Sequence, residues 1–245
     1  MRSLRLLGFG VLVVCVVVGG VAMSSASAAL PQVLPETAGK TAAITNTTLV
    51  VVEFVNAKKV VCEKATGTSK EAGMTPLGEF HINFEKCTTT AGGIKFVCTG
   101  LGDTSGNMLA LGEYHFVYDA LGASEMEALG IAILFLVSTT HVECAGGIVL
   151  TKAEGSELCL IAEPHVAKTL HAFACKISST PGVPEDKVYW NDEGKEVKHG
   201  SPPAAGQWGM TISQNEESAI GGAWSGGFLL LWLSGGSNVS AAIMG

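Results

Sequence analysis

Charged residues are scarce in this 245-residue chain, and arginine is almost absent. Only 15% of the residues are Asp, Glu, Lys or Arg, against about 25% in ordinary globular domains, which excludes coiled coils and charged disordered arms. Both arginines, Arg2 and Arg5, lie within the first five residues. Arginine makes the bidentate contacts that hold phosphates. An acidic chain with no arginine after residue 5 is poorly suited to nucleic acid or to anionic membrane surfaces.

The N-terminus has the three parts of a secretory signal peptide. Arg2 and Arg5 precede an apolar run at 6–23, and the small-residue site Ala-Ser-Ala follows at 26–28. We expect cleavage after Ala28 or one residue later, with no stable membrane span afterwards. An uncleaved anchor is the alternative, because about 18 apolar residues can just cross a bilayer. After cleavage, 13 lysines and 22 acidic residues give a net charge of 13 − 22 = −9.

Six cysteines remain once the signal peptide, which includes Cys15, is removed. An even number in an exported chain indicates disulfides, although six cysteines allow 15 pairings. No Cys-x-x-Cys occurs, whereas zinc sites have such short paired spacings, so we expect neither a metal nor a cofactor. We favour the pairing in chain order, because each bond then joins neighbouring strands: Cys62–Cys87, Cys98–Cys144 and Cys159–Cys175.

Strand-like segments recur along the chain, with turn residues about every 10 to 15 positions. Residues 78–85 alternate, which places Phe80, Ile82 and Phe84 on one face. Other expected strands lie at 48–55, 59–62, 94–98 and 113–118. The pattern predicts an all-β fold, a sandwich or barrel of short, mainly antiparallel strands with disulfides, over a single domain at 29–245.

The apolar segment at 128–137 fits either a helix or a strand. A Ser-x-x-Glu helix-capping pattern precedes it at 124–127. Gly130 and the two threonines that follow at 139–140 favour a strand. Ten apolar residues are too few to cross a bilayer, so we expect a buried element.

The C-terminal third has two distinctive segments. Four prolines make 178–207 the best candidate for a boundary, and inside it 188–190 and 196–198 flank turn residues as in a small hairpin. After Glu217 no charged residue occurs. We expect Gly-rich strands packed onto the main body there; a surface-adhesive tail is the alternative.

Motifs for catalysis are incomplete. A relaxed nucleophile elbow surrounds Ser225, but no Asp, Glu or His follows it to complete a triad. Glu113 and His115 share a strand face. His141 and Glu143 do so too. Either pair could act as an acid–base couple or as two metal ligands, but nothing marks a third partner, so we expect solvated polar side chains.

All four tryptophans lie in the last 56 residues. Indole rings exposed on a sheet can stack on sugars, which would make a glycan-binding surface. Large core side chains in a Gly-rich region are the alternative. The candidate ligand-binding residues are Trp190, Trp208, Trp224 and Trp232.

Short motifs follow one another in a characteristic order. A signal ending Ala-Ser-Ala-Ala-Leu-Pro is followed by Lys-Val-Val-Cys at 59–62, Phe-His-Ile-Asn-Phe-Glu-Lys-Cys at 80–87, Phe-Val-Cys at 96–98 and His-Val-Glu-Cys at 141–144. Over roughly residues 1–200 this order resembles a group of uncharacterised exported β-rich proteins of soil actinobacteria. The group has no assigned activity. The resemblance implies an exported all-β domain and supports pairing the cysteines in chain order.

The sequence therefore predicts a secreted or cell-envelope-associated protein with a structural or interaction role and no catalysis. A glycan or an envelope protein is the expected partner, and nucleic acid is not. The alternatives are a carbohydrate-binding module that uses the four tryptophans and, less favoured, a secreted hydrolase built on a carboxylate pair or a His–Glu couple.

Overall fold

The structure is a computed structural model that describes residues 31–34, 41–54, 56–71, 77–119, 130–144, 148–185, 188–190, 196–198, 210–214 and 220–244. Within these ranges every regular secondary-structure element is a β-strand, which confirms the all-β prediction. The strands are β1 (Gln32–Leu34), β2 (Thr41–Asn46), β3 (Val50–Phe54), β4 (Lys59–Cys62), β5 (Lys64–Glu71), β6 (Leu77–Glu85), β7 (Thr88–Ala91), β8 (Ile94–Gly100), β9 (Met108–Asp119), β10 (Ile131–Cys144), β11 (Ile148–Ile161), β12 (Leu170–Cys175), β13 (Val188–Trp190), β14 (Glu196–Lys198), β15 (Met210–Gln214), β16 (Ile220–Ser234), β17 (Ser237–Asn238) and β18 (Ala242–Met244).

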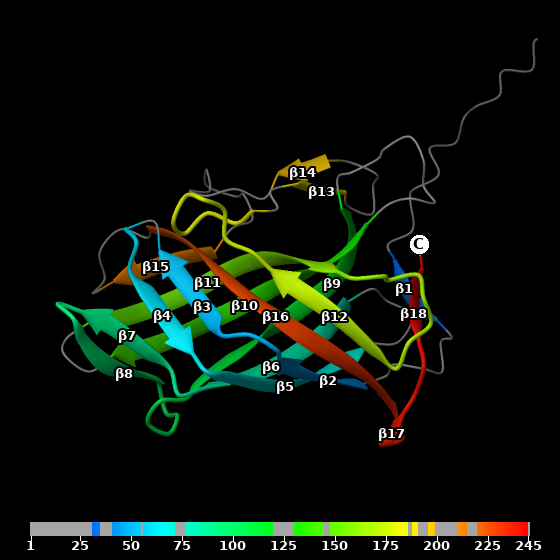
Figure 1. Ribbon diagram of the computed structural model, residues 1–245, viewed down its shortest axis with the longest axis horizontal. Helices are drawn as coiled ribbons and strands as arrows, with labels where there is room; N and C mark the ends of the chain where they lie inside the picture. The colour runs from blue at the N-terminus through cyan, green and yellow to red at the C-terminus, as the bar shows by residue number, and fades with distance from the viewer. Residues whose placement is uncertain are drawn as a thin grey trace, which may run out of the picture.

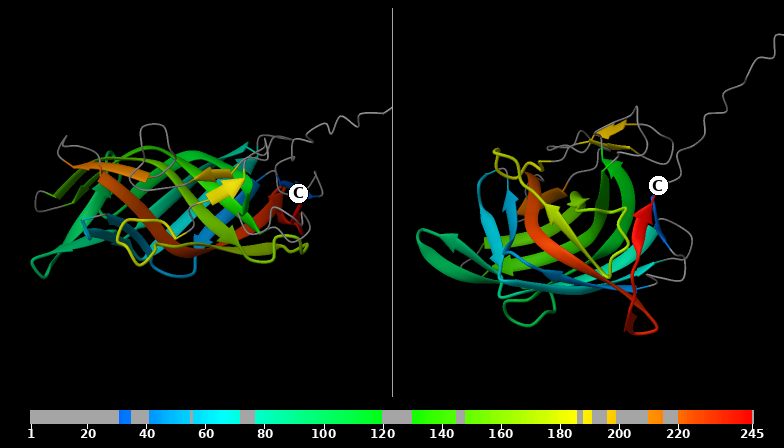
Figure 2. Two further views of the ribbon diagram at one scale, coloured as in Figure 1. Left: turned by 90° about the horizontal axis from the view of Figure 1, so that it is seen from above. Right: turned by 45° about the vertical axis from the view of Figure 1, so that its right-hand side comes forward.

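Eight antiparallel strands close into a barrel. In order around the wall they are β2, β5, β6, β9, β10, β11, β12 and β16, and β16 pairs back with β2. Figures 1 and 2 show long strands wrapping obliquely around a shared interior. Closure satisfies backbone hydrogen bonds that an open sheet would leave at its two edges.

The outer strands complete a second circuit of pairings beside the barrel. From β16 it passes through β3, β4, β7 and β8 to β10, and on the other side β15 connects β11 with β16. Three strands, β10, β11 and β16, belong to both circuits and are 14, 14 and 15 residues long. They are longer than the short strands expected from the sequence because each continues from one circuit into the other.

Strand β10 changes partners where it passes between the circuits. Its residues 131–137 pair with β9, and its residues 142–144 pair with β8. Between these two stretches its register against β11 shifts twice. Bulges bend and twist a strand, so the two register shifts allow β10 to pair with β9 in the barrel and with β8 in the second circuit. The apolar segment at 128–137 thus lies in a strand from Ile131 onward.

Aromatic side chains fill the barrel. Phe80, Ile82 and Phe84 of β6 are buried in the interior, as the alternation at 78–85 predicts. Phe80 meets Phe135 edge-on with ring centroids 5.1 Å apart, and Phe173 stacks on Phe228 at 5.0 Å. An eight-stranded barrel is just wide enough to be filled by its own side chains. The described interior is therefore a packed core, and one continuous hydrophobic cluster contains residues of both circuits.

Two strand glycines allow the barrel wall to pack tightly. Gly78 lies directly opposite Tyr114, and a Cβ on Gly78 would come within 2.2 Å of the tyrosine ring. A Cβ on Gly112 would come within 2.0 Å of the Leu136 carbonyl oxygen. An aromatic ring over a strand glycine is a known device in curved sheets. Any side chain at either position would displace a neighbour.

A buried carboxylate completes the wall between β11 and β16. β12 pairs with β11 from Cys159 onward and β15 pairs with it up to Glu154, so neither strand covers the residues between. There Glu157, which is fully buried, accepts a hydrogen bond from the Trp224 backbone N–H at 3.0 Å. The Glu157 carboxylate thus accepts the hydrogen bond that a backbone carbonyl of a neighbouring strand would otherwise accept, because a buried N–H needs an acceptor.

Short elements cover one end and one outer face of the barrel. β1 pairs with β18, Val33 opposite Ile243, and the Ile243 N–H donates to the Pro164 carbonyl at 2.9 Å. Figure 1 shows this pair at the right-hand end of the molecule. The predicted hairpin is confirmed as β13–β14, with Tyr189 opposite Val197. Its Tyr189 joins a second small hydrophobic cluster on the outside of the barrel.

The uncharged C-terminal segment also folds as expected. β16 pairs with β2, β3, β12, β15 and β17 and so forms part of the main body. Residues 1–28, the predicted signal peptide, lie outside the described residues. In the part of the chain that is described, no helix is long and apolar enough to span a membrane.

Candidate functional site

The six cysteines form three disulfides, and all six are buried. They are Cys62–Cys87, Cys98–Cys144 and Cys159–Cys175, the pairing in chain order that the sequence favours. Two of the bonds connect residues directly opposite one another, across β8 and β10 and across β11 and β12. Each bond therefore crosses between neighbouring backbone segments of the walls, and the thiols are unavailable for metal binding or catalysis.

Two of the four candidate sugar-stacking tryptophans are core residues. Trp224 is 3% exposed and lies with its ring centroid 5.8 Å from Phe84. Trp232 is 0% exposed and packs against His171 at the end of the barrel. Both point inward because they occupy the interior-facing positions of β16, so neither can stack on an external sugar. The Trp190 side chain and all of Trp208 lie outside the described residues.

Glutamates gather in an outer hollow over the barrel wall, which we call the acidic hollow. It has a volume of about 850 Å³. Glu79 of β6 lies directly opposite Glu113 of β9, and both are exposed. Like charges in this position repel each other, so a cation or a proton donor would be stabilised beside them. The lining residues are Glu79, His81, Gly112, Glu113, Leu136, Val137, Ser138, Glu154 and Gly155.

The structure regroups the predicted His–Glu pairs. Glu113 meets Glu79 and His81 in the acidic hollow, while its predicted partner His115 lies further along β9, opposite Leu134. Glu79 and His81 were not candidates from the sequence, since the polar face of an alternating strand is ordinarily solvated. Only the pairing of β6 with β9 brings them to Glu113.

The second predicted pair lies elsewhere on β10. His141 and Glu143 are both exposed, and Glu143 faces Thr99 of β8. Among the described residues, no three His, Cys, Asp or Glu side chains are grouped so as to hold a metal ion. The elbow-like serine, Ser225, lies in the middle of β16 opposite Val51, so it is not at a strand-to-helix turn.

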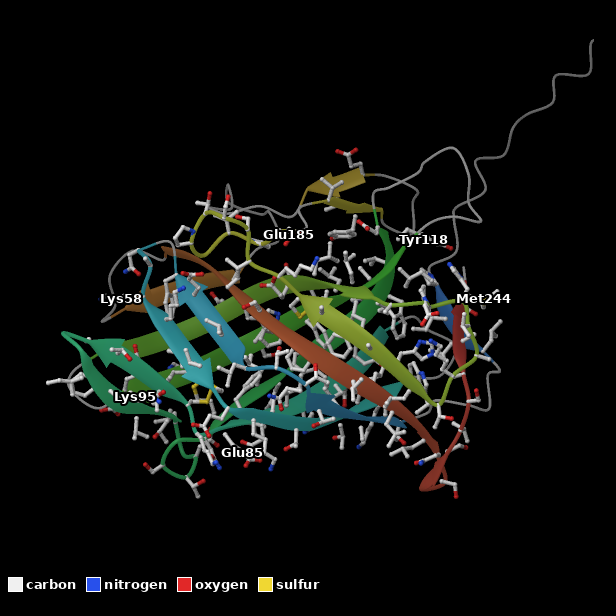
Figure 3. The ribbon with its side chains drawn as sticks, viewed as in Figure 1. Lys58, Glu85, Lys95, Tyr118, Glu185 and Met244 are labelled. Atoms are coloured by element: carbon white, nitrogen blue, oxygen red, sulfur yellow. A yellow bond between two sulfur atoms is a disulfide. The ribbon has the colours of Figure 1, made fainter. Side chains whose placement is uncertain are left out.

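Lysines gather in a second outer hollow, which we call the lysine groove. It lies over β4, β7 and the start of β8 and has a volume of about 480 Å³. Figure 3 shows Lys58 and Lys95 at the same end of the molecule, far from Met244. Sequence reasoning missed this site because Lys95 lies far from the other groove lysines in the chain. It follows Lys59 by 95 − 59 = 36 positions. The lining residues are Leu49, Ala57, Lys58, Lys59, Val61, Glu63, Thr88, Thr90 and Lys95.

The groups with perturbed acidity lie outside both hollows. A hydrogen bond from Lys64 lowers the pKa of Glu85, and one from Lys168 lowers the pKa of Glu163. Burial of Tyr189 against barrel residues such as Val117 and Leu134 raises the pKa of its hydroxyl to about 12. These shifts are explained by ion pairs and by packing, and they give no sign of an acid–base pair prepared for catalysis.

Comparison with known proteins does not assign the chain to a family. No family model matches it, and no curated protein and no solved structure matches it either.

Proposed function

We propose that the protein is an exported, cell-envelope-associated interaction protein that binds its partner on its outer surface and does not catalyse a reaction. The observation that carries this proposal is the filled barrel. Aromatic side chains such as Phe80, Phe135 and Phe228 occupy the interior and are at most 3% exposed. Small-molecule sites usually need an apolar cavity. Because the interior is filled by side chains, we expect a partner to bind at the outer hollows.

The disulfides support export. Disulfides persist in oxidising compartments and are rare in the reducing cytosol. Three buried bonds agree with the signal-like N-terminus and with release from the cytoplasm. The outer face then offers two hollows of opposite charge, which suit polar or charged envelope components.

A secreted hydrolase is the second candidate, because one observation favours it. Glu79 and Glu113 are directly opposite each other across β6 and β9, where Cβ atoms are about 4.5–5.5 Å apart. Glutamate side chains on such a pair can bring their carboxyl groups to the separation of about 5–5.5 Å that retaining glycosidases use. Glycan hydrolysis that is lost in Glu113→Gln and in Glu79→Gln, but kept in the control Glu143→Gln, would replace the non-catalytic proposal.

The test of the proposal is the intact mass of the unreduced native protein from culture medium, envelope and cytosol. We expect a species that begins near Ala29, is six hydrogens lighter than the fully reduced chain, and occurs in the medium or envelope. The same protein should be retained by an isolated envelope fraction without turning over its components. A cytosolic, full-length species with free thiols would overturn the proposal.

A further inference from the structure

The lysine groove concentrates positive charge on a chain that is acidic as a whole. The full sequence has a net charge of −7, yet three lysines line this one hollow: Lys58, Lys59 and Lys95. All three are exposed. A local excess of one sign in a concave surface raises the concentration of ions of the other sign.

The strand register aligns the groove's cations. Val60 pairs with Thr89, so the next position brings Lys59 level with Thr90, and Thr90 pairs directly with Lys95. A lysine, a threonine and a lysine thus stand side by side on β4, β7 and β8. Neighbouring strands are about 4.8 Å apart, so the two lysines lie about 10 Å apart at their backbones, with a hydroxyl group between them.

The charged residues that line the groove are three lysines and one glutamate, Glu63, a formal net charge of 3 − 1 = +2. Lys59 contacts Glu53 at 2.8 Å, and Lys86, just outside the groove, contacts Glu63 at 3.2 Å. Among the described residues, the Lys95 side chain forms no hydrogen bond or ion pair, although its backbone pairs with β7. Its ammonium group is therefore available to an incoming anion.

The floor of the groove is held rigid. Cys62, at the end of β4, is bonded to Cys87 immediately before β7. The Thr89 hydroxyl donates to the Lys59 carbonyl at 2.7 Å. These two links fix β4 against β7, so the lysine stems start from ordered backbone. A preorganised site loses less entropy when it binds a ligand.

We propose that the lysine groove binds the anionic groups, phosphate or carboxylate, of a polysaccharide. Lysine is an effective point-charge partner for phosphate, and Thr88 and Thr90 supply hydroxyls for hydrogen bonds to sugar. Leu49, 55% exposed beside the lysines, offers an apolar surface to the carbon face of a sugar ring. The volume of about 480 Å³ lies within the range of about 300–1,000 Å³ for ligand sites. This proposal deepens the proposed envelope function and rests on it for the source of the polymer.

The test uses the purified, oxidised mature protein and three labelled polymers in low salt. Polygalacturonate carries carboxylates, a phosphomannan carries phosphates, and dextran is neutral. The test variant is Lys58→Gln/Lys95→Gln. The matched control is Lys70→Gln/Lys176→Gln, which removes the same charge from exposed lysines outside the groove.

We expect the wild type to bind at least one of the two anionic polymers and not dextran. The test variant should bind at least about tenfold more weakly, since it removes two of the three cations that line the groove, and the control should change less than about twofold. Competition by inorganic phosphate or by monomeric galacturonate then identifies the recognised group. Absence of binding, or an equal loss in the control, would overturn the groove proposal. If the protein binds no anionic polymer but is still retained by the isolated envelope fraction, the groove proposal fails while the proposed envelope function is supported.

Discussion

Removal of the Cys98–Cys144 bond is expected to destabilise the protein more than removal of either other disulfide. The three bonds close loops of 46, 25 and 16 residues, in the order Cys98–Cys144, Cys62–Cys87 and Cys159–Cys175. Loop-closure entropy converts these lengths into losses of about 4, 3.5 and 3 kcal/mol in the free energy of unfolding.

The comparison is internally controlled. All six cysteines are buried to a similar degree, so the packing lost on substitution by alanine is similar for each pair. The three loops also follow one another along the chain without overlapping, so each can be removed without altering the other two. The differences between the variants therefore report loop length.

The assay is equilibrium urea unfolding of three double Cys→Ala variants, followed by far-ultraviolet circular dichroism and by tryptophan fluorescence. Coincident transitions would justify two-state free energies. A reversed order, or a Cys98→Ala/Cys144→Ala variant as stable as the wild type, would refute the reasoning. Loss of all three bonds sums to about 10 kcal/mol, comparable to the whole stability of a typical domain, so the reduced protein should be unfolded.

Three further predictions concern buried positions. Trp232→Ala should lower the free energy of unfolding by about 3–5 kcal/mol, because it empties a fully buried position; urea unfolding measures this, and a loss below about 1 kcal/mol would contradict the assigned burial. Gly78→Ala should cost about 1–3 kcal/mol by pressing on the Tyr114 ring, and this cost should be smaller when it is measured in a Tyr114→Ala background, which lacks the ring. Between pH 10 and 12 the wild type should lose stability as pH rises, because Tyr189 ionises in the unfolded chain before it ionises in the folded one, whose pKa is about 12. Tyr189→Phe should show a shallower fall in thermal melts over that range, and identical slopes would argue against the raised pKa.

Local patterns predicted the strands and the disulfides because both depend on nearby residues. Alternation at 78–85 predicted which face of β6 is buried, and the turn residues after Trp190 predicted the β13–β14 hairpin. The cysteines paired in chain order because each partner lies on the next or a nearby strand. For the strands and the hairpin the decisive signal lay within a short stretch of chain.

The sites depended on register between distant strands, which no local pattern contains. Glu79 meets Glu113 only because β6 pairs with β9, and Lys95 joins Lys59 only because β7 lies between β4 and β8. The inward direction of Trp224 was also hidden, since both faces of β16 carry apolar residues, glycine and serine, and alternation there carries no information. The sequence also did not predict that β10, β11 and β16 each continue from the barrel into the second circuit. Their length depends on bulges and changes of partner for which the sequence has no local signal.

The position of β16 late in the chain has a consequence for biogenesis. This strand supplies the last wall of the barrel and of the second circuit, where it pairs with β2, β3, β12 and β15. While the chain emerges from its N-terminus onward, neither circuit can close until residues 220–234 are available. The waiting strands β2 and β3 expose unpaired backbone groups during that interval, and such edges attract other extended chains. A holding chaperone, or rapid delivery of the final segment, would protect the nascent protein at this stage.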